Sequence, residues 1–171
     1  MGPWTVPYGI AVTLLVVAGV AKVAEPRDSV GALARSGLVV PAVIVRIVAA
    51  FEVGLGTAAV VGGTRTAAGV VALSYLAFTA FVVQALVRRL PIGSCGCFGR
   101  VDTPPSAGHV AVNLGCALAA VGAAASGPAP WLGLPDVDAT TAIATVVLVL
   151  VGTALAAALL TVVPRALAAR G

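Results

Sequence analysis

The sequence predicts an all-α membrane protein, a polytopic helical bundle of four core helices followed by a fifth, C-terminal transmembrane helix. Only 9% of the 171 residues are charged and 60% are hydrophobic, whereas a soluble domain carries about 25% charged residues because its surface faces water. The apolar residues also gather in five stretches, and each is close to the roughly 20 residues that a helix needs to cross a bilayer. A chain of this composition has the lipid bilayer as its main surrounding.

Five apolar stretches account for most of the chain and comprise residues 6–23, 38–61, 67–87, 110–125 and 140–163. No basic residue precedes the first, and its apolar run is too long for a secretory signal, so we expect a retained helix. Prolines and glycines concentrate between the stretches and mark the connections. We expect a four-helix membrane domain over residues 1–126, with a cysteine-containing loop at 88–108. An interfacial loop and an extra transmembrane helix should follow over residues 127–171.

Small residues inside the stretches predict where helices pack closely. Lipid gives membrane helices no hydrophobic drive to associate, so they associate partly through close backbone packing at small residues. Such residues include Gly54, Gly56 and Gly69, together with alanine-rich segments at 117–120 and 154–158. We expect these positions to form the packing surfaces of the bundle.

The basic residues lie mostly at the predicted helix ends. Since no basic run carries interleaved aromatic residues, a nucleic-acid partner is excluded. With five spans, the first and third connections and the C-terminus share one side of the membrane. That side carries eight of the ten basic residues, and the other carries only Arg65. The positive-inside rule therefore predicts an external N-terminus and a cytoplasmic cysteine loop.

The most concentrated chemistry is the Cys95-Gly96-Cys97 pair. Next-but-one alpha carbons can approach within the range of about 4.4–6.8 Å that a disulfide requires. The ring so closed would be small and strained, which makes the bond easy to reduce and unsuited to a structural role. Arg100 nearby would favour the thiolate form. The pair therefore indicates a thiol–disulfide exchange site.

Two other interpretations of the pair stay open. The thiols could be inert and reduced, or they could form half of a metal site. Zinc would need two further ligands, and only His109 and Cys116 are candidates, at spacings that match no standard zinc pattern. We therefore assign no metal.

His109, Asn113 and Cys116 follow the cysteine loop at positions i, i+4 and i+7. This spacing places them on one face of the fourth helix, and polar groups in a membrane span normally face the bundle interior. His109 could transfer protons during thiol chemistry, with Asn113 as its hydrogen-bonding neighbour. Alternatively, Asn113 bonds a neighbouring helix and Cys116 is a small buried hydrophobe.

Glu52 falls near the middle of the second span, where a charged side chain costs about 3 kcal/mol. Arg46 lies six residues earlier, on a different helix face, so the two need not pair. We expect Glu52 to be protonated or hydrogen-bonded to a neighbouring helix, and either a proton-relay or a ligand-binding role stays open. Lys22 and Glu25 flank the end of the first helix and suggest an interfacial anchor with its partner.

The order of these features resembles the MauE family of methylamine utilisation proteins, within the wider group of DoxX-like bundle proteins. The resemblance covers about residues 10–121. Its parts are residues 19–26, Glu52 within residues 51–56, residues 78–81, the string Cys95-Gly96-Cys97-Phe98-Gly99, and Asn113. The cysteine string is the most specific part, and the fifth apolar stretch goes beyond the four-helix core of the family.

The resemblance implies a multi-pass protein of the bacterial cytoplasmic membrane with a redox-associated role. Family members are associated with the production of methylamine dehydrogenase, whose disulfides form outside the cytoplasm, and with a thioredoxin-like partner. By analogy, Cys95 and Cys97 would exchange disulfides with such a partner, as in a thiol–disulfide oxidoreductase of methylamine metabolism. Disulfide formation outside the cytoplasm requires the cysteine loop on the external side of the membrane, whereas the distribution of basic residues places it on the cytoplasmic side. Both orientations stay open.

Two other function classes compete with the redox role. One is a non-catalytic membrane scaffold, in which the cysteine pair is incidental. The other is a small transporter or quinone-binding protein centred on Glu52. No haem, flavin or nucleotide motif is present, and no motif supports a quinone.

Overall fold

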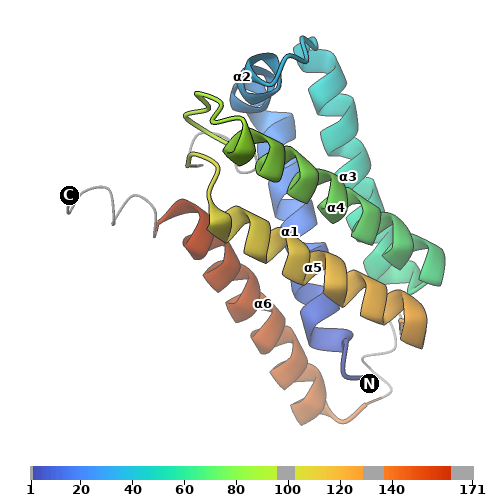
Figure 1. The fold of residues 1–171 in the computed structure, drawn as a ribbon. Coiled ribbons are helices and arrows are strands. Elements are labelled where there is room, and N and C mark those ends of the chain that lie inside the picture. The colour runs from blue at the N-terminus through green and yellow to red at the C-terminus, as the bar shows by residue number, and fades with distance from the viewer. Residues whose placement is uncertain (1, 96–102, 129–136, 163–171) are drawn as a thin grey trace.

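The computed structural model describes residues 2–95, 103–128 and 137–162. Within these ranges every regular element is a helix, and turns or irregular segments connect them (Figure 1). The helices are α1 (Thr5–Ala24), α2 (Arg27–Arg35), α3 (Ala42–Gly62), α4 (Arg65–Val87), α5 (Ala107–Ser126) and α6 (Ala139–Thr161).

All of these helices except α2 are long and apolar enough to cross a membrane. They coincide with the five predicted stretches, so the predicted fold class is confirmed and the chain is a multi-pass membrane protein. Their outer faces are rich in exposed valine, leucine and isoleucine. In α3 and α6, only 28% and 22% of the most apolar 18-residue segment is buried inside the protein. Exposure of such apolar faces to water would be energetically unfavourable, whereas contact with lipid carries no such cost.

Local sequence sets the helix ends. Pro41 is extended and immediately precedes α3, which therefore begins later than the apolar stretch that starts at residue 38. Gly63 ends α3 in the left-handed conformation with φ of 52°, which glycine adopts at low cost. Thr64 and Asp138 then cap α4 and α6 by accepting hydrogen bonds from backbone amides, those of Ala67 and Thr141.

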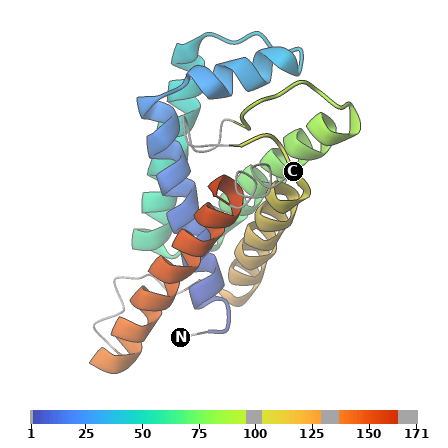
Figure 2. The ribbon, with the colours of Figure 1, turned by 90° about the vertical axis from the view of Figure 1, so that its left-hand side faces the viewer.

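The helix α2 was not expected from the sequence. It occupies the connection between the first two spans and lies across one end of the bundle (Figures 1 and 2). Its buried residues are Ser29 and Ala32, and Ala32 packs with Ala85 in the last turn of α4 and with Ile92 after that helix. The helix is only nine residues long, and the three-residue spacing of its two buried side chains was the signal that could have indicated it.

α1 is the central helix, in contact with α3, α5 and α6, while α4 packs along α5. α6 also crosses over α1 in Figure 2, and the two helices are in contact. The α1–α6 contact is close at Gly152, where an added Cβ would lie 2.3 Å from the Ile10 side chain. The proposed division of the chain at residue 126 stays a prediction, although α6 contributes Leu160 to the main core.

Only some of the predicted small residues mark close helix contacts. A Cβ at Gly56 would lie 2.4 Å from Val16 of α1, as expected for a packing position. Gly54 and Gly69 have no atom within 4 Å of an added Cβ, so their expected packing role is wrong. Gly19 is the second close contact between α1 and α3, with a backbone carbonyl oxygen of α3 at 2.9 Å. Spacing alone cannot tell which face of a helix meets its neighbour.

Candidate functional site

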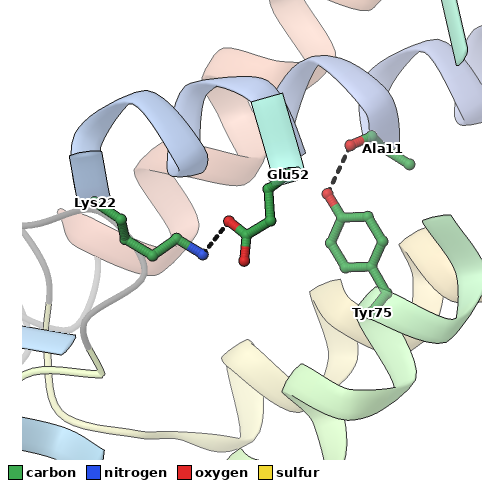
Figure 3. A network of polar contacts seen from close by, with 4 residues as sticks. All are labelled: Ala11, Lys22, Glu52 and Tyr75. Carbon is green, nitrogen blue, oxygen red and sulfur yellow. Dashed lines mark hydrogen bonds and ion pairs between the residues drawn. The ribbon is translucent and has the colours of Figure 1, made fainter. Parts of the chain in front are cut away.

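A buried ion pair joins α1 to α3. Lys22, in the last turn of α1, meets the carboxylate of Glu52 from the middle of α3 (Figure 3). The two residues are only 8% and 3% exposed. Gly19 lies one turn before Lys22, and an added Cβ there would be 3.3 Å from Glu52 Cβ. The missing side chain at Gly19 therefore lets the helices approach closely enough for the pair to form.

This pairing corrects two expectations from the sequence. Lys22 does not partner Glu25, whose carboxylate instead lies 3.8 Å from the exposed Arg27 side chain. Glu52 is paired with a cation of the neighbouring helix, whereas the sequence suggested a protonated or simply hydrogen-bonded carboxyl. Arg46, whose pairing with Glu52 the sequence left open, instead donates from its Nε to the backbone oxygen of Val23 at 3.3 Å.

Two aromatic rings of α4 complete the surroundings of the ion pair. Lys22 Nζ lies 4.7 Å from the centre of the Phe78 ring, which attracts the ammonium through its negative face. Tyr75 meets Phe78 edge to face with 5.9 Å between ring centres. The Tyr75 hydroxyl donates to the Ala11 backbone oxygen at 2.6 Å and so fixes α4 against α1 (Figure 3).

Cys95 is buried at the start of the cysteine loop, with 5% exposure. Its amide donates to the Thr103 oxygen at 2.9 Å, so the two sides of the loop meet at its base. The Thr103 hydroxyl in turn donates to the Leu160 oxygen at 2.6 Å. Leu160 belongs to the last turn of α6, where carbonyl groups lack partners within the helix. α6 thereby holds the base of the loop. Cys97 and Arg100 lie outside the described residues.

Lys22, Glu52 and Cys95 line one cavity of about 370 Å³. The rest of its wall comes from α2, α3, α4 and the segment before α3, and is apolar apart from one serine. These residues are Ser29, Ala32, Leu33, Val40, Ile44, Val45, Val48, Ala77, Phe78, Phe81 and Val82. The cavity therefore combines a long apolar wall with one ion pair and one thiol.

The polar face predicted for the fourth helix is present on α5. His109, Asn113 and Cys116 are all buried on it. His109 is fully buried, and its Nδ1 lies 3.0 Å from Ser106 Oγ, just before the helix. His109 and Asn113 line a second, small cavity of about 20 Å³, together with Lys22 and others. Cys116 lies in the apolar core and lines neither cavity.

Lys22 and Phe78 border both cavities, whereas Cys95 lines only the larger one and His109 only the smaller one. The structure brings Lys22, Glu52 and Cys95 together on one side, and His109 with Asn113 on the other. Thr103 and Ser106 position Cys95 and His109, and the sequence analysis missed both. Their places on either side of Pro104-Pro105 were the only sequence signal. Within the described ranges, no three His, Cys, Asp or Glu side chains gather to hold a metal ion.

Comparison with known proteins places these features in a family. The model of the family described as methylamine utilisation protein MauE matches residues 1–126. That match covers α1 to α5 and the cysteine loop. No curated protein and no solved structure matches the chain.

Proposed function

Since the chain belongs to the methylamine utilisation protein MauE family, we propose that it is a membrane thiol–disulfide redox protein that supports the maturation of a partner protein. Cys95 and Cys97 are its exchanging pair, and the membrane is the bacterial cytoplasmic membrane. One observation supports this most strongly. The Cys95 thiol lines a cavity that also contains a buried ion pair, in a chain with little other polar chemistry.

In the proposed reaction the oxidised Cys95–Cys97 pair accepts electrons from a dithiol of the partner. A partner thiolate attacks one sulfur of the pair and forms a mixed disulfide while the other sulfur leaves as a thiolate. The second partner thiolate then resolves the mixed disulfide. The partner leaves with a disulfide, the pair is left as two thiols, and two electrons have moved. A thioredoxin-like or disulfide-containing protein is the proposed partner.

Single cysteine variants test the exchange. With Cys97→Ser, the remaining Cys95 should trap a mixed disulfide with a thioredoxin-like protein, visible as a band shift that dithiothreitol reverses. The same shift is expected with Cys95→Ser through Cys97. Cys116→Ser is the matched control, because Cys116 is buried in the core and lines neither cavity. If both single variants support partner maturation as well as the unchanged chain does, the cysteine pair is incidental and the protein is a scaffold.

The side of the membrane is tested by thiol labelling in a Cys116→Ser background. A membrane-impermeant maleimide applied to intact cells labels Cys97 only if the loop faces outward. We propose an outward loop because the exchange that this family supports forms disulfides outside the cytoplasm. Labelling that requires broken cells would instead support the orientation given by the basic residues, and the partner would then be cytoplasmic.

A further inference from the structure

We infer that the cavity beside Cys95 binds the ring of a lipid-soluble quinone, which is the oxidant that returns the Cys95–Cys97 pair to a disulfide. The redox step rests on the proposed function, whereas binding of the ring rests on the cavity alone. An oxidant of this kind completes the cycle, because a cysteine pair that has oxidised its partner must itself be oxidised before it can react again.

The size and lining of the cavity suit such a ring. Its volume of about 370 Å³ lies within the range of about 300–1,000 Å³ that is usual for small-ligand sites. Phe78 and Phe81 supply aromatic surface, and valine, isoleucine, leucine and alanine side chains supply the rest of the apolar wall. Sites of this kind are mostly apolar with a few fixed polar groups that orient the ligand. Here those groups are Lys22 and Glu52.

The cavity is open toward the membrane. Ile44 and Val48 of α3 line it, yet they are 44% and 50% exposed. Both lie on the outward apolar face of a helix that crosses the bilayer. This opening favours a ligand that is dissolved in lipid over water-soluble oxidants such as glutathione disulfide.

The charges select a neutral ligand with a carbonyl group. The Lys22 ammonium has three N–H donors and is already neutralised by Glu52. An anionic headgroup or fatty acid would bring a second negative charge to a balanced pair, at a high cost in this apolar site. A quinone oxygen needs only a hydrogen bond from the ammonium. As the oxygen gains electron density on reduction, the same ammonium stabilises it more strongly.

The redox step balances with these groups. Cys95 and Cys97 begin as two thiols and end as one disulfide, so one S–S bond forms and two S–H bonds break. The two electrons and two protons pass to the quinone, whose two carbonyl oxygens become the hydroxyls of a quinol. The quinol then leaves to the bilayer through the opening at Ile44 and Val48.

Binding is tested first without redox chemistry. The full chain carrying Cys95→Ser and Cys97→Ser is placed in lipid nanodiscs and titrated with decylubiquinone and with menadione by calorimetry. We expect saturable binding at one site per chain. Val48→Trp fills the cavity and should weaken binding at least tenfold. Ile47→Trp is the matched control, because Ile47 is the adjacent exposed residue of α3 and does not line the cavity; this variant should bind normally.

Three outcomes would overturn the inference. These are no saturable binding, equal losses with both tryptophan variants, or full displacement of the quinone by oleate or phosphatidylglycerol, which would mark a lipid site. The proposed function is tested separately by exchange with the partner, starting from chemically oxidised Val48→Trp. That variant should still exchange one disulfide but fail to be oxidised again by quinone. Exchange without quinone binding overturns only this inference, and quinone binding without exchange overturns only the proposed function.

Discussion

Lys22→Met should destabilise the bundle by about 3–5 kcal/mol, since removal of one partner leaves the other charge buried and uncompensated. The position of Glu52 prevents its carboxylate from avoiding this burial cost by moving into water. Glu52 is the eleventh residue of the 21-residue α3, so about 15 Å of helix separate it from either end at 1.5 Å per residue. Its short side chain cannot reach water across that distance. Loss of the Lys22 contact with Phe78 adds a further cost of about 0.5–2 kcal/mol.

Glu52→Leu should cost less than Lys22→Met. Lys22 lies two residues before the end of α1, so its long side chain can turn toward the interface and keep its charge in water. The double variant leaves no buried charge and should return to within about 2 kcal/mol of the unchanged chain. The sum of the two single losses should therefore exceed the loss of the double variant by at least about 1 kcal/mol.

The assay is equilibrium unfolding by sodium dodecyl sulfate in mixed micelles, followed by circular dichroism and by a second probe to check two-state behaviour. Leu76→Ala, at an exposed lipid-facing position of α4, controls for the general cost of altering a span. Simple addition of the two single losses in the double variant would refute the ion pair as a coupled unit. A loss below about 1 kcal/mol for Lys22→Met would refute its burial cost.

Three further changes address the packing, the loop and a helix end. Gly19→Ala should lower the free energy of unfolding by about 1–3 kcal/mol in the same assay, because the added Cβ would lie 2.9 Å from a backbone oxygen of α3. Gly54→Ala should be neutral or slightly stabilising, because the space around Gly54 is open. Thr103→Val removes the hydrogen bond from the loop to α6 and should raise the rate of maleimide labelling of the buried loop thiol severalfold. Thr161→Val removes a bond within α6 only and should leave labelling unchanged; equal rates in both variants would contradict the anchoring. Hydrogen bonds from Thr141 lower the pKa of Asp138 below its ordinary value of 3.8. The contribution of this cap to stability is therefore complete above pH 3.8 and is lost as the pH falls through the lower pKa of the folded state. Amide exchange in the first turn of α6 should therefore accelerate at low pH, and Asp138→Asn should abolish this dependence; an unchanged pH profile would speak against the cap.

Periodicity predicted the α5 face well, because its residues lie on one helix. His109, Asn113 and Cys116 follow the 3.6-residue repeat, and a polar face of a membrane helix turns inward whatever its neighbours are. The same reasoning failed for Glu52, because its partner lies on another helix. Lys22 is 30 residues away in the chain, and nothing in either local sequence says that α1 and α3 are neighbours. The nearer Glu25 was a reasonable but wrong choice for Lys22.

For the cysteine loop, too, the sequence indicates the chemistry while only the packing defines its surroundings. The Cys95-Gly96-Cys97 spacing indicates thiol chemistry by itself, because next-but-one residues can approach within disulfide distance without help from any other part of the chain. The surroundings of Cys95 depend on residues from α1, α2, α3 and α4, which only packing brings together. α2 helps to close the cavity, but it is only nine residues long, and so short a segment carries little periodic signal in the sequence.

The sequence by itself determined that this protein is a five-span membrane bundle with a thiol pair between its third and fourth spans. Composition and run length decide that much, because lipid admits only long apolar helices whose backbone is satisfied internally. Tertiary structure alone decided that Lys22 meets Glu52, that α6 holds the base of the cysteine loop, and that Cys95 lines a cavity open toward lipid. These are contacts between helices distant in the chain, and they depend on where glycines such as Gly19 allow two backbones to approach.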